Sequence, residues 1–459
     1  MGPSAVADGG GDRRPHVLYV AWGFPPSRSG GVYRALATVN AFAAAGFRVT
    51  VLTAARETFE RYTGADPSLE SQVRPEVTVV RIPFEWPALE TDLRRWSALR
   101  MFAPDRWRER QRRRDVSSFP EVGYGPWRAP LEEAALAVHA RSPVDLAVAS
   151  ANPSVDFTAA DVLNRRHGVP YVMDYRDAWM LDVFDGGLMH PEGGRVDRLE
   201  KDLLGRAREV WFVNEPIRDW HARRHPDVAA RMHVVANGFD PEFAPRPRLA
   251  PPDGSRPLTF GYIGTLSRKV PLHEFTQGWA TARSTHPDLG LARAEVWGHL
   301  GYFSIPSSAM LRLVESHAGD GLTYHGPVPK TELRDVYDRF DALLLLLGAG
   351  RYVTSGKVFE YAATGLPIVS LHDPVNAAAD VLRGYPLWFP VTGLSTEEIS
   401  DALGAAAAAA RRADAGTREA CAAFAEQYRR DLQLRPRLQA LADLPGRRTS
   451  TGAPVGEHA

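Results

Sequence analysis

The sequence is poor in several residue types and patterns, and each shortage excludes a class of protein. Its 459 residues include a single cysteine, Cys421, so no intrachain disulfide can form and a reducing compartment is indicated. Acidic and basic residues balance at 55 each, which leaves no overall field of the kind that attracts nucleic acid. No run approaches the roughly 18 apolar residues that a membrane-spanning helix needs. Residues 1–14 lack the apolar core of a signal peptide, so we expect a disordered start and a cytoplasmic protein.

Lysine is also scarce. Only Lys201, Lys269, Lys330 and Lys357 occur among the 55 basic residues, so arginine is the usual cation of this chain. Two of these lysines fall in loops where the element order below predicts a ligand.

The first half of the chain alternates strands and helices. Residues 16–22 are an apolar strand, 23–31 a loop with the pair Gly30 and Gly31, 32–45 a helix and 47–53 the next strand. Glycines at a helix start let a ligand approach the backbone closely. They do not form the G-x-G-x-x-G fingerprint of dinucleotide-binding folds, which counts against a nicotinamide-dependent oxidoreductase.

Further strands are predicted at the residue ranges 77–82, 144–149, 170–174, 209–213 and 232–236. The loop 150–154, with Asn152, and the loop from Asp174 to Trp179 follow two of them, at the sheet edge where ligands bind. Asp174, Arg176 and Asp177 either contact a substrate or form an ion pair that fixes the loop. The sequence leaves both readings open.

Residues 93–115 differ from their surroundings because nine arginines are interleaved with large apolar side chains. This composition suits an anionic membrane surface or an anionic acceptor. The alternative is an exposed, arginine-rich helical insertion without a partner.

Residues 241–257 hold six prolines and are the predicted linker between a first domain, 15–240, and a second, 258–416. In the second domain strands are predicted at the ranges 258–264, 294–297, 322–325, 341–347, 366–370 and 387–391. Thr331 is a predicted N-cap, and residues 395–398 have the form of a capping box. One helix over 417–434, in a helical segment 417–445, is expected to end the fold, and 446–459 to be disordered.

The second domain contains the stretch on which the functional prediction rests, residues 355–365. An apolar strand leads into a glycine-containing loop and a short helix, 357–364, whose apolar positions share one face and leave Lys357, Glu360 and Thr364 toward the other. A carboxylate there can accept both hydroxyls of a ribose, and a lysine beside free backbone N–H groups suits phosphate. Taken alone, Glu360 is better explained as part of a solvated helix face.

The chain resembles retaining glycosyltransferases of the GT-B fold, in the large group called glycosyltransferase family four. Four stretches carry the resemblance, and they lie at residues 24–31, 237–240, 264–269 and 355–369. The resemblance implies an α/β protein with two Rossmann-like parallel-sheet domains that face each other across a cleft.

The resemblance also implies roles for individual residues. Gly30 and Gly31 would lie against the donor diphosphate or the acceptor, and Glu360 would bind the ribose. Donor binding would further involve Thr265, Ser355, Gly356 and Lys357. Arg268, Lys269 and Asp177 are the catalytic candidates, the two cations neutralising the diphosphate, and Asn152, Asp174, Arg176 and Tyr352 are candidates for sugar or acceptor contact.

The implied reaction moves a sugar from a nucleotide-sugar donor to an acceptor hydroxyl, with retention. Cations that hold charge on the departing diphosphate stabilise its transition state. No D-x-D occurs in the chain, so neither a metal nor another cofactor is expected.

Two departures from the family pattern keep a second function open. The family's pair of glutamates eight positions apart is incomplete, since Tyr352 stands eight residues before Glu360, and the histidine common in the first half has no clear match. A degenerate GT-B scaffold that binds a ligand or a partner enzyme without turnover is the alternative.

Overall fold

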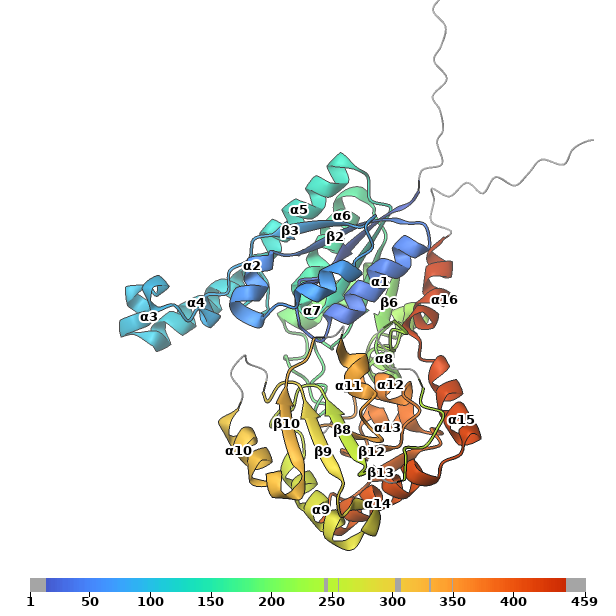
Figure 1. Cartoon of the computed structure of the whole chain (residues 1–459). Coiled ribbons are helices and arrows are strands. Elements are labelled where there is room, and N and C mark those ends of the chain that lie inside the picture. Colours follow the sequence, from blue (N-terminus) through green and yellow to red (C-terminus); the bar gives the residue numbers. More distant parts are fainter. Residues whose placement is uncertain are drawn as a thin grey trace, which may run out of the picture.

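Two parallel β-sheets, each covered by helices on both faces, make up the computed structural model (Figure 1). It describes residues 14–242, 247–254, 256–301, 307–329, 332–348 and 350–442. The predicted tail 446–459, the N-cap Thr331 and all but Arg14 of the predicted disordered start lie outside these residues. Within them, no helix is both long and apolar enough to span a membrane.

The amino-terminal sheet has seven strands in the order β3-β2-β1-β4-β5-β6-β7, and all neighbours are parallel. The strands are β1 (His16–Val20), β2 (Arg48–Ala54), β3 (Thr78–Ile82), β4 (Leu146–Ala151), β5 (Tyr171–Tyr175), β6 (Glu209–Phe212) and β7 (Met232–Val234). Every residue of β1, β4 and β5 is buried, as unbroken apolar runs predict for a sheet covered on both faces.

Helices cover the two faces of this sheet. They are α1 (Val32–Ala44), α2 (Arg56–Thr58), α5 (Arg128–Arg141), α6 (Phe157–His167), α7 (Arg195–Arg206) and α8 (Glu215–Arg224). Side chains of α5, α6 and α7 share one apolar core, and those of α1 pack in a second core. The sequence analysis did not predict α5, α7 and α8. The apolar residues of α5 and α8 follow the helical period only weakly, whereas α7 is strongly amphipathic and was missed although its pattern is present in the sequence.

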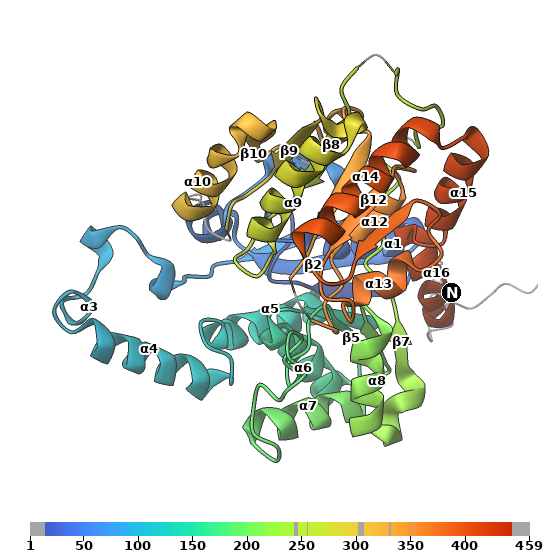
Figure 2. The same cartoon turned by 90° about the horizontal axis from the view of Figure 1, so that it is seen from below.

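The arginine-rich segment forms an arm that extends away from both domains (Figures 1 and 2). It contains α3 (Ala98–Phe102) and α4 (Pro104–Ser118). The guanidinium of Arg100 lies 3.9 Å from the ring centroid of Trp96 and 4.5 Å from that of Trp107, so these two indoles hold the arm together. Phe102, 82 % exposed, and Met101, 51 % exposed, are the apolar side chains that remain accessible at its end.

The carboxyl-terminal sheet has six parallel strands in the order β10-β9-β8-β11-β12-β13. They are β8 (Thr259–Ile263), β9 (Arg293–Trp297), β10 (Leu322–Gly326), β11 (Ala342–Leu346), β12 (Ile368–Leu371) and β13 (Trp388–Val391). Its helices are α9 (Leu272–Thr285), α10 (Ser308–Ser316), α11 (Leu333–Tyr337), α12 (Lys357–Ala362), α13 (Ala377–Leu382) and α14 (Thr396–Arg412). The predicted capping box is confirmed in its first half, because the Ser395 hydroxyl accepts a hydrogen bond from the Glu398 N–H at 3.2 Å. The Glu398 carboxylate accepts from the Thr392 hydroxyl at 3.3 Å.

The linker is tied to the second domain rather than free. Arg248 and Arg256 both pair with the buried carboxylate of Asp341, at 2.9 and 2.5 Å, just ahead of β11. Residues 248–254 and 256–257 therefore run along this domain before the chain enters β8.

The predicted single helix over 417–434 is wrong, because the structure has two helices, α15 (Ala415–Glu426) and α16 (Arg430–Ala442). α15 packs on the second domain, whereas Leu434 and Leu441 of α16 are buried in the core that contains α1. The chain thus crosses back to the first domain at residues 427–429 (Figure 1).

Arg430 fixes this return. It is 6 % exposed and donates to the carbonyl oxygens of Asn237 (2.5 Å), Gly238 (3.0 Å) and Tyr33 (2.9 Å), and to the Asp240 carboxylate (2.8 Å). One side chain therefore joins α16, the turn at 237–240 and α1.

We expect Arg430→Met to destabilise the fold by about 2–3 kcal/mol, because charge-assisted hydrogen bonds are lost and their acceptors stay buried. Urea unfolding measures the change. Arg429→Met is the matched control, since Arg429 makes surface pairs with Glu426 and Asp431 that contribute about 0–1 kcal/mol. Equal unfolding midpoints for the two variants would contradict the assignment.

Candidate functional site

The helix α12 carries the two side chains on which the prediction rests. Val358, Phe359 and Ala362 are buried, while Lys357 and Glu360 are half-buried on the other side of the helix. The fourth predicted apolar residue, Ala363, is buried just past the helix end. The predicted division is confirmed for Lys357 and Glu360. It is wrong for Thr364, which lies past the helix end and is 2 % exposed, with its hydroxyl donating to the Tyr361 carbonyl at 2.7 Å.

Lys357 lies against the end of β8. Its ammonium group donates to the Tyr262 hydroxyl at 2.5 Å and lies 4.3 Å from the centroid of that ring. Gly264, at φ +134°, leaves space for it, since a Cβ there would lie 2.9 Å from Nζ. Burial lowers the pKa of Lys357 to about 7, and the negative charge of Glu360 opposes the shift only in part. The site thus holds a cation that a bound anion would stabilise.

Glu360 faces the first domain. One carboxylate oxygen accepts a hydrogen bond from the buried Tyr337 hydroxyl at 3.3 Å. Burial and, next in size, the charge of Glu360 raise the pKa of Tyr33, which belongs to α1. The carboxylate therefore lies close to the helix that follows Gly30 and Gly31, across the junction of the domains.

The loop after β8 brings the predicted cations to the same junction. Arg268 and Lys269 are both exposed, and the Lys269 ammonium lies 3.2 Å from the ring centroid of Phe184, a residue of the first domain. A Cβ on Gly348, in the loop after β11, would lie 3.0 Å from the Cβ of Lys269. The ligand loops of β8 and β11 are therefore neighbours.

Thr265, Ser355 and Gly356 complete the predicted donor residues. The Thr265 carbonyl accepts from the Tyr262 hydroxyl at 2.9 Å, and the Ser355 hydroxyl accepts from the Lys357 N–H at 3.4 Å. Gly356 is the N-cap of α12. All three are half-buried beside Lys357.

Of the two glycines before α1, the structure requires one. A Cβ on Gly31 would lie 1.5 Å from a guanidinium nitrogen of Arg176, so this arginine rests on bare backbone, whereas a Cβ on Gly30 would meet nothing. Gly31, Arg176 and Asn152 line a small cavity of about 100 Å³. Asp177 is 3.6 Å from Arg176, which matches the ion pair that the sequence left open.

Asp174 is placed otherwise than predicted. It is fully buried and receives three hydrogen bonds from Arg34, at 2.6, 2.9 and 3.0 Å, and one from Ser150 at 3.3 Å. A carboxylate enclosed in this way is unavailable for the sugar or acceptor contact expected of it. It fixes α1 against β5 instead.

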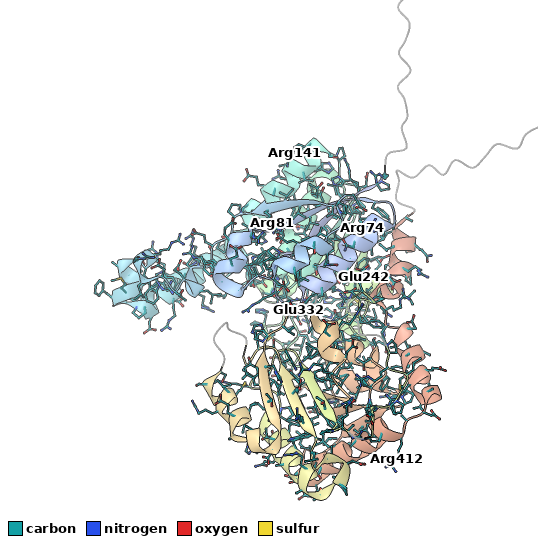
Figure 3. All side chains as sticks on the ribbon, in the orientation of Figure 1. Arg74, Arg81, Arg141, Glu242, Glu332 and Arg412 are labelled. Carbon is teal, nitrogen blue, oxygen red and sulfur yellow. The ribbon has the colours of Figure 1, made fainter. Side chains whose placement is uncertain are left out.

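Tyr352 packs against the first domain. Its ring approaches Gly186, where a Cβ would lie 3.2 Å away, and Asn214 donates to the Tyr352 carbonyl at 2.8 Å and to the Thr354 hydroxyl at 3.0 Å. The residue that replaces the family's glutamate is thus part of the contact between the domains. Figure 3 shows Glu242 and Glu332 at the level of the same junction.

Sequence reasoning missed several residues of this site. Only the tertiary structure brings five further residues close to the predicted ones, and these are Tyr33, Arg34, Phe184, Asn214 and Tyr262. Arg34 alone left a signal, because it interrupts the apolar face of α1 beside the buried Ala35 and Leu36.

Among the described residues, no group of three or more His, Cys, Asp and Glu side chains could hold a metal ion. The polar groups described at the site are the ammonium of Lys357, the carboxylate of Glu360 and the hydroxyls that hydrogen-bond to them.

Comparison with known proteins finds a family model that matches part of the chain. Residues 29–238, which are 210 of the 459 residues, match the model of the glycosyl transferase 4-like domain. The match falls on the first of the two parallel-sheet domains. The two domains together have the arrangement of the GT-B fold.

Solved structures share the whole two-domain fold. A glycosyltransferase from Rickettsia africae is 11% identical with a TM-score of 0.62, covering 94% of this chain and 98% of its own. For sucrose-phosphate synthase from Thermosynechococcus elongatus the identity is 15% and the TM-score 0.59, with coverage of 94% and 99%. Anabaena HepE in complex with UDP-glucose is 14% identical at a TM-score of 0.57, with coverage of 94% and 100%. No curated protein matches the sequence.

The Lys357 ammonium provides a test of the geometry of this candidate site. Since its pKa is about 7 in the folded protein and near 10.4 in the unfolded chain, the unfolded state binds more protons between these values. Wild-type stability should therefore rise with pH from about 7 toward 10 relative to Lys357→Met. Melting temperatures of the two proteins over this range give the difference.

The exposed Lys201 offers the control, because Lys201→Met should show no such trend. If the difference in melting temperature between wild type and Lys357→Met stays constant over the same pH range, the pKa of Lys357 is not lowered in the folded protein.

Proposed function

We propose that the protein transfers a sugar from a nucleotide-sugar donor to an acceptor hydroxyl, with retention and without a metal ion. The observation that carries the proposal is the pairing of Lys357 and Glu360 on α12, opposite α1 of the glycosyl transferase 4-like domain. HepE, which shares the fold, was solved with UDP-glucose, and a nucleotide sugar suits this pair.

Each group has a part in donor binding. The Glu360 carboxylate accepts hydrogen bonds from the ribose hydroxyls. Lys357 and the exposed Arg268 and Lys269 bind the diphosphate, and a bound anion raises the pKa of Lys357 again, so that it is protonated in the complex. Arg176, against Gly31, faces the donor from the first domain.

The reaction needs no protein nucleophile. The acceptor oxygen forms a bond to the anomeric carbon on the face that the phosphate leaves, and the departing phosphate oxygen accepts the acceptor's proton. Negative charge grows on the diphosphate as the sugar–phosphate bond breaks, so fixed cations stabilise the transition state more than the ground state.

A scaffold without turnover is the second candidate, because Tyr352 packs on Gly186 and Asp174 is enclosed by Arg34. Both contacts remove polar groups expected to meet the sugar. Hydrolysis of a nucleotide sugar by the protein separates the two candidates, since a scaffold produces none.

We expect UDP or GDP to raise the melting temperature of the wild type. Glu360→Gln should abolish that shift, because the amide has an NH2 group in place of one carboxylate oxygen and this group cannot accept a hydrogen bond from a ribose hydroxyl. Thermal denaturation with each nucleotide tests this, with Glu315→Gln, an exposed residue of α10, as control. No shift of the wild type with any nucleotide would contradict the proposal.

We further propose that the α3–α4 arm contacts an anionic membrane surface or an anionic acceptor. Residues 93–118 hold nine arginines against three acidic residues, and the apolar Phe102, Met101 and Leu93 are exposed. Arginines around an exposed apolar end match a lipid surface with anionic headgroups.

Replacing both Arg106 and Arg110 by glutamate should lower binding to phosphatidylglycerol-containing vesicles at least tenfold, since each basic residue near such a surface contributes about 1 kcal/mol. Vesicle flotation measures the bound fraction. The same reversal at the exposed Arg223 and Arg312 is the control, and equal losses in both variants would show a nonspecific charge effect.

A further inference from the structure

A second, larger cavity lies beside the site in the first domain and has a volume of about 510 Å³. Its walls come from α4 and the segment after it, the loop that follows β5, and the segment that enters α7. This volume is in the range of pockets that hold small organic molecules. We call it the α4 pocket.

The α4 pocket adjoins the donor side. Asn152 lines both this pocket and the small cavity that contains Gly31 and Arg176, and Asp177 lies in its wall. A molecule in the α4 pocket therefore has one end next to the residues that face the donor.

Most of its wall is apolar. Val116, Val122, Ala178, Trp179, Met189 and Val196 are among its lining residues. Val122 and Met189 are 56 % and 57 % exposed, and the neighbouring Leu188 is 45 % exposed. Exposed apolar side chains around an apolar pocket mark a site for an apolar ligand.

Several polar groups of the wall are already engaged. The Glu121 carboxylate accepts from the backbone N–H groups of Ser154 and Val155 at 3.0 and 2.9 Å, and the Arg195 guanidinium donates to the Val116 carbonyl at 2.6 Å. Burial lowers the pKa of His190, so its ring is neutral at pH 7. A hydroxyl-rich sugar would leave many of its hydroxyls unpaired here, and each unpaired hydroxyl costs about 1–3 kcal/mol.

We infer that the acceptor is an apolar molecule with a hydroxyl group, whose apolar body occupies the α4 pocket and whose hydroxyl points to Asn152 and the donor. The inference rests on the proposed sugar transfer and names its acceptor class. Such a molecule is either a free aromatic or aliphatic alcohol or a lipid drawn from a membrane, and both share this chemistry.

The test uses the fluorescent alcohol 7-hydroxy-4-methylcoumarin as a probe of the full-length protein. Fluorescence anisotropy should show saturable binding that excess glucose does not reverse. Val122→Asp should weaken it about tenfold, the effect of losing one apolar side-chain contact. The matched control is Leu291→Asp, which should bind the probe as the wild type does. Leu291 is an exposed apolar residue of the second domain, two residues before β9.

Two competitor arms identify the source of the acceptor. The probe is challenged with phosphatidylcholine vesicles that either contain or lack diacylglycerol. If only the vesicles with diacylglycerol displace the probe, the acceptor is a lipid. If neither kind of vesicle displaces it, the acceptor is a free alcohol. Displacement by glucose, or equal affinity of Val122→Asp and wild type, overturns the inference.

Thermal shifts with UDP and GDP are recorded on the same samples. Nucleotide binding without probe binding overturns the acceptor class alone, whereas the absence of nucleotide binding in the wild type counts against the sugar transfer itself. Val122→Asp should keep the nucleotide shift, because Val122 lies in the first domain and touches no donor residue of α12.

Discussion

The hydrogen bonds of Arg430 hold α16, the turn at 237–240 and α1 together at the junction of the two domains. This side chain begins α16, the helix that returns to the first domain, and it binds the carbonyl of Tyr33 in α1 together with the turn at 237–240. Tyr33 in turn lies close enough to Glu360 to feel its charge. The position of α1 relative to α12, and hence the shape of the proposed donor site, follows from where α16 is held.

The site is built from charges that the fold does not fully satisfy. Lys357 is buried enough to lower its pKa to about 7, and Glu360 compensates only in part. Such a cation is unfavourable in the free protein and becomes favourable when a diphosphate arrives, so some of the binding energy goes into restoring its charge. Asp174 shows the opposite arrangement, because Arg34 pairs it completely and leaves nothing for a ligand.

Contact between the domains uses residues that the family pattern would give to the sugar. Tyr352 lies on Gly186, Asn214 binds the loop at 352–354, and Phe184 covers the Lys269 ammonium. These contacts pass through the junction that a donor must enter. Opening and closing of the two domains would therefore change the surroundings of Lys269 and Tyr352 together.

The sequence by itself determined the two parallel sheets and the exposed side of α12, because apolar runs and short helical periods are local properties of the chain. Strand ends were found to within about two residues for the same reason. The glycosyltransferase resemblance rests instead on four short stretches, at residues 24–31, 237–240, 264–269 and 355–369. The sequence analysis missed α5, α7 and α8, although α7 is strongly amphipathic. It merged α15 with α16, since a change of partner domain leaves no mark in the pattern. Only the tertiary structure decided which charges face a cavity. Asp174 and Asp177 are three residues apart, yet the first is enclosed by Arg34 from α1 and the second lines the α4 pocket. Burial of a charged side chain depends on partners distant in sequence, and their approach is fixed by packing alone.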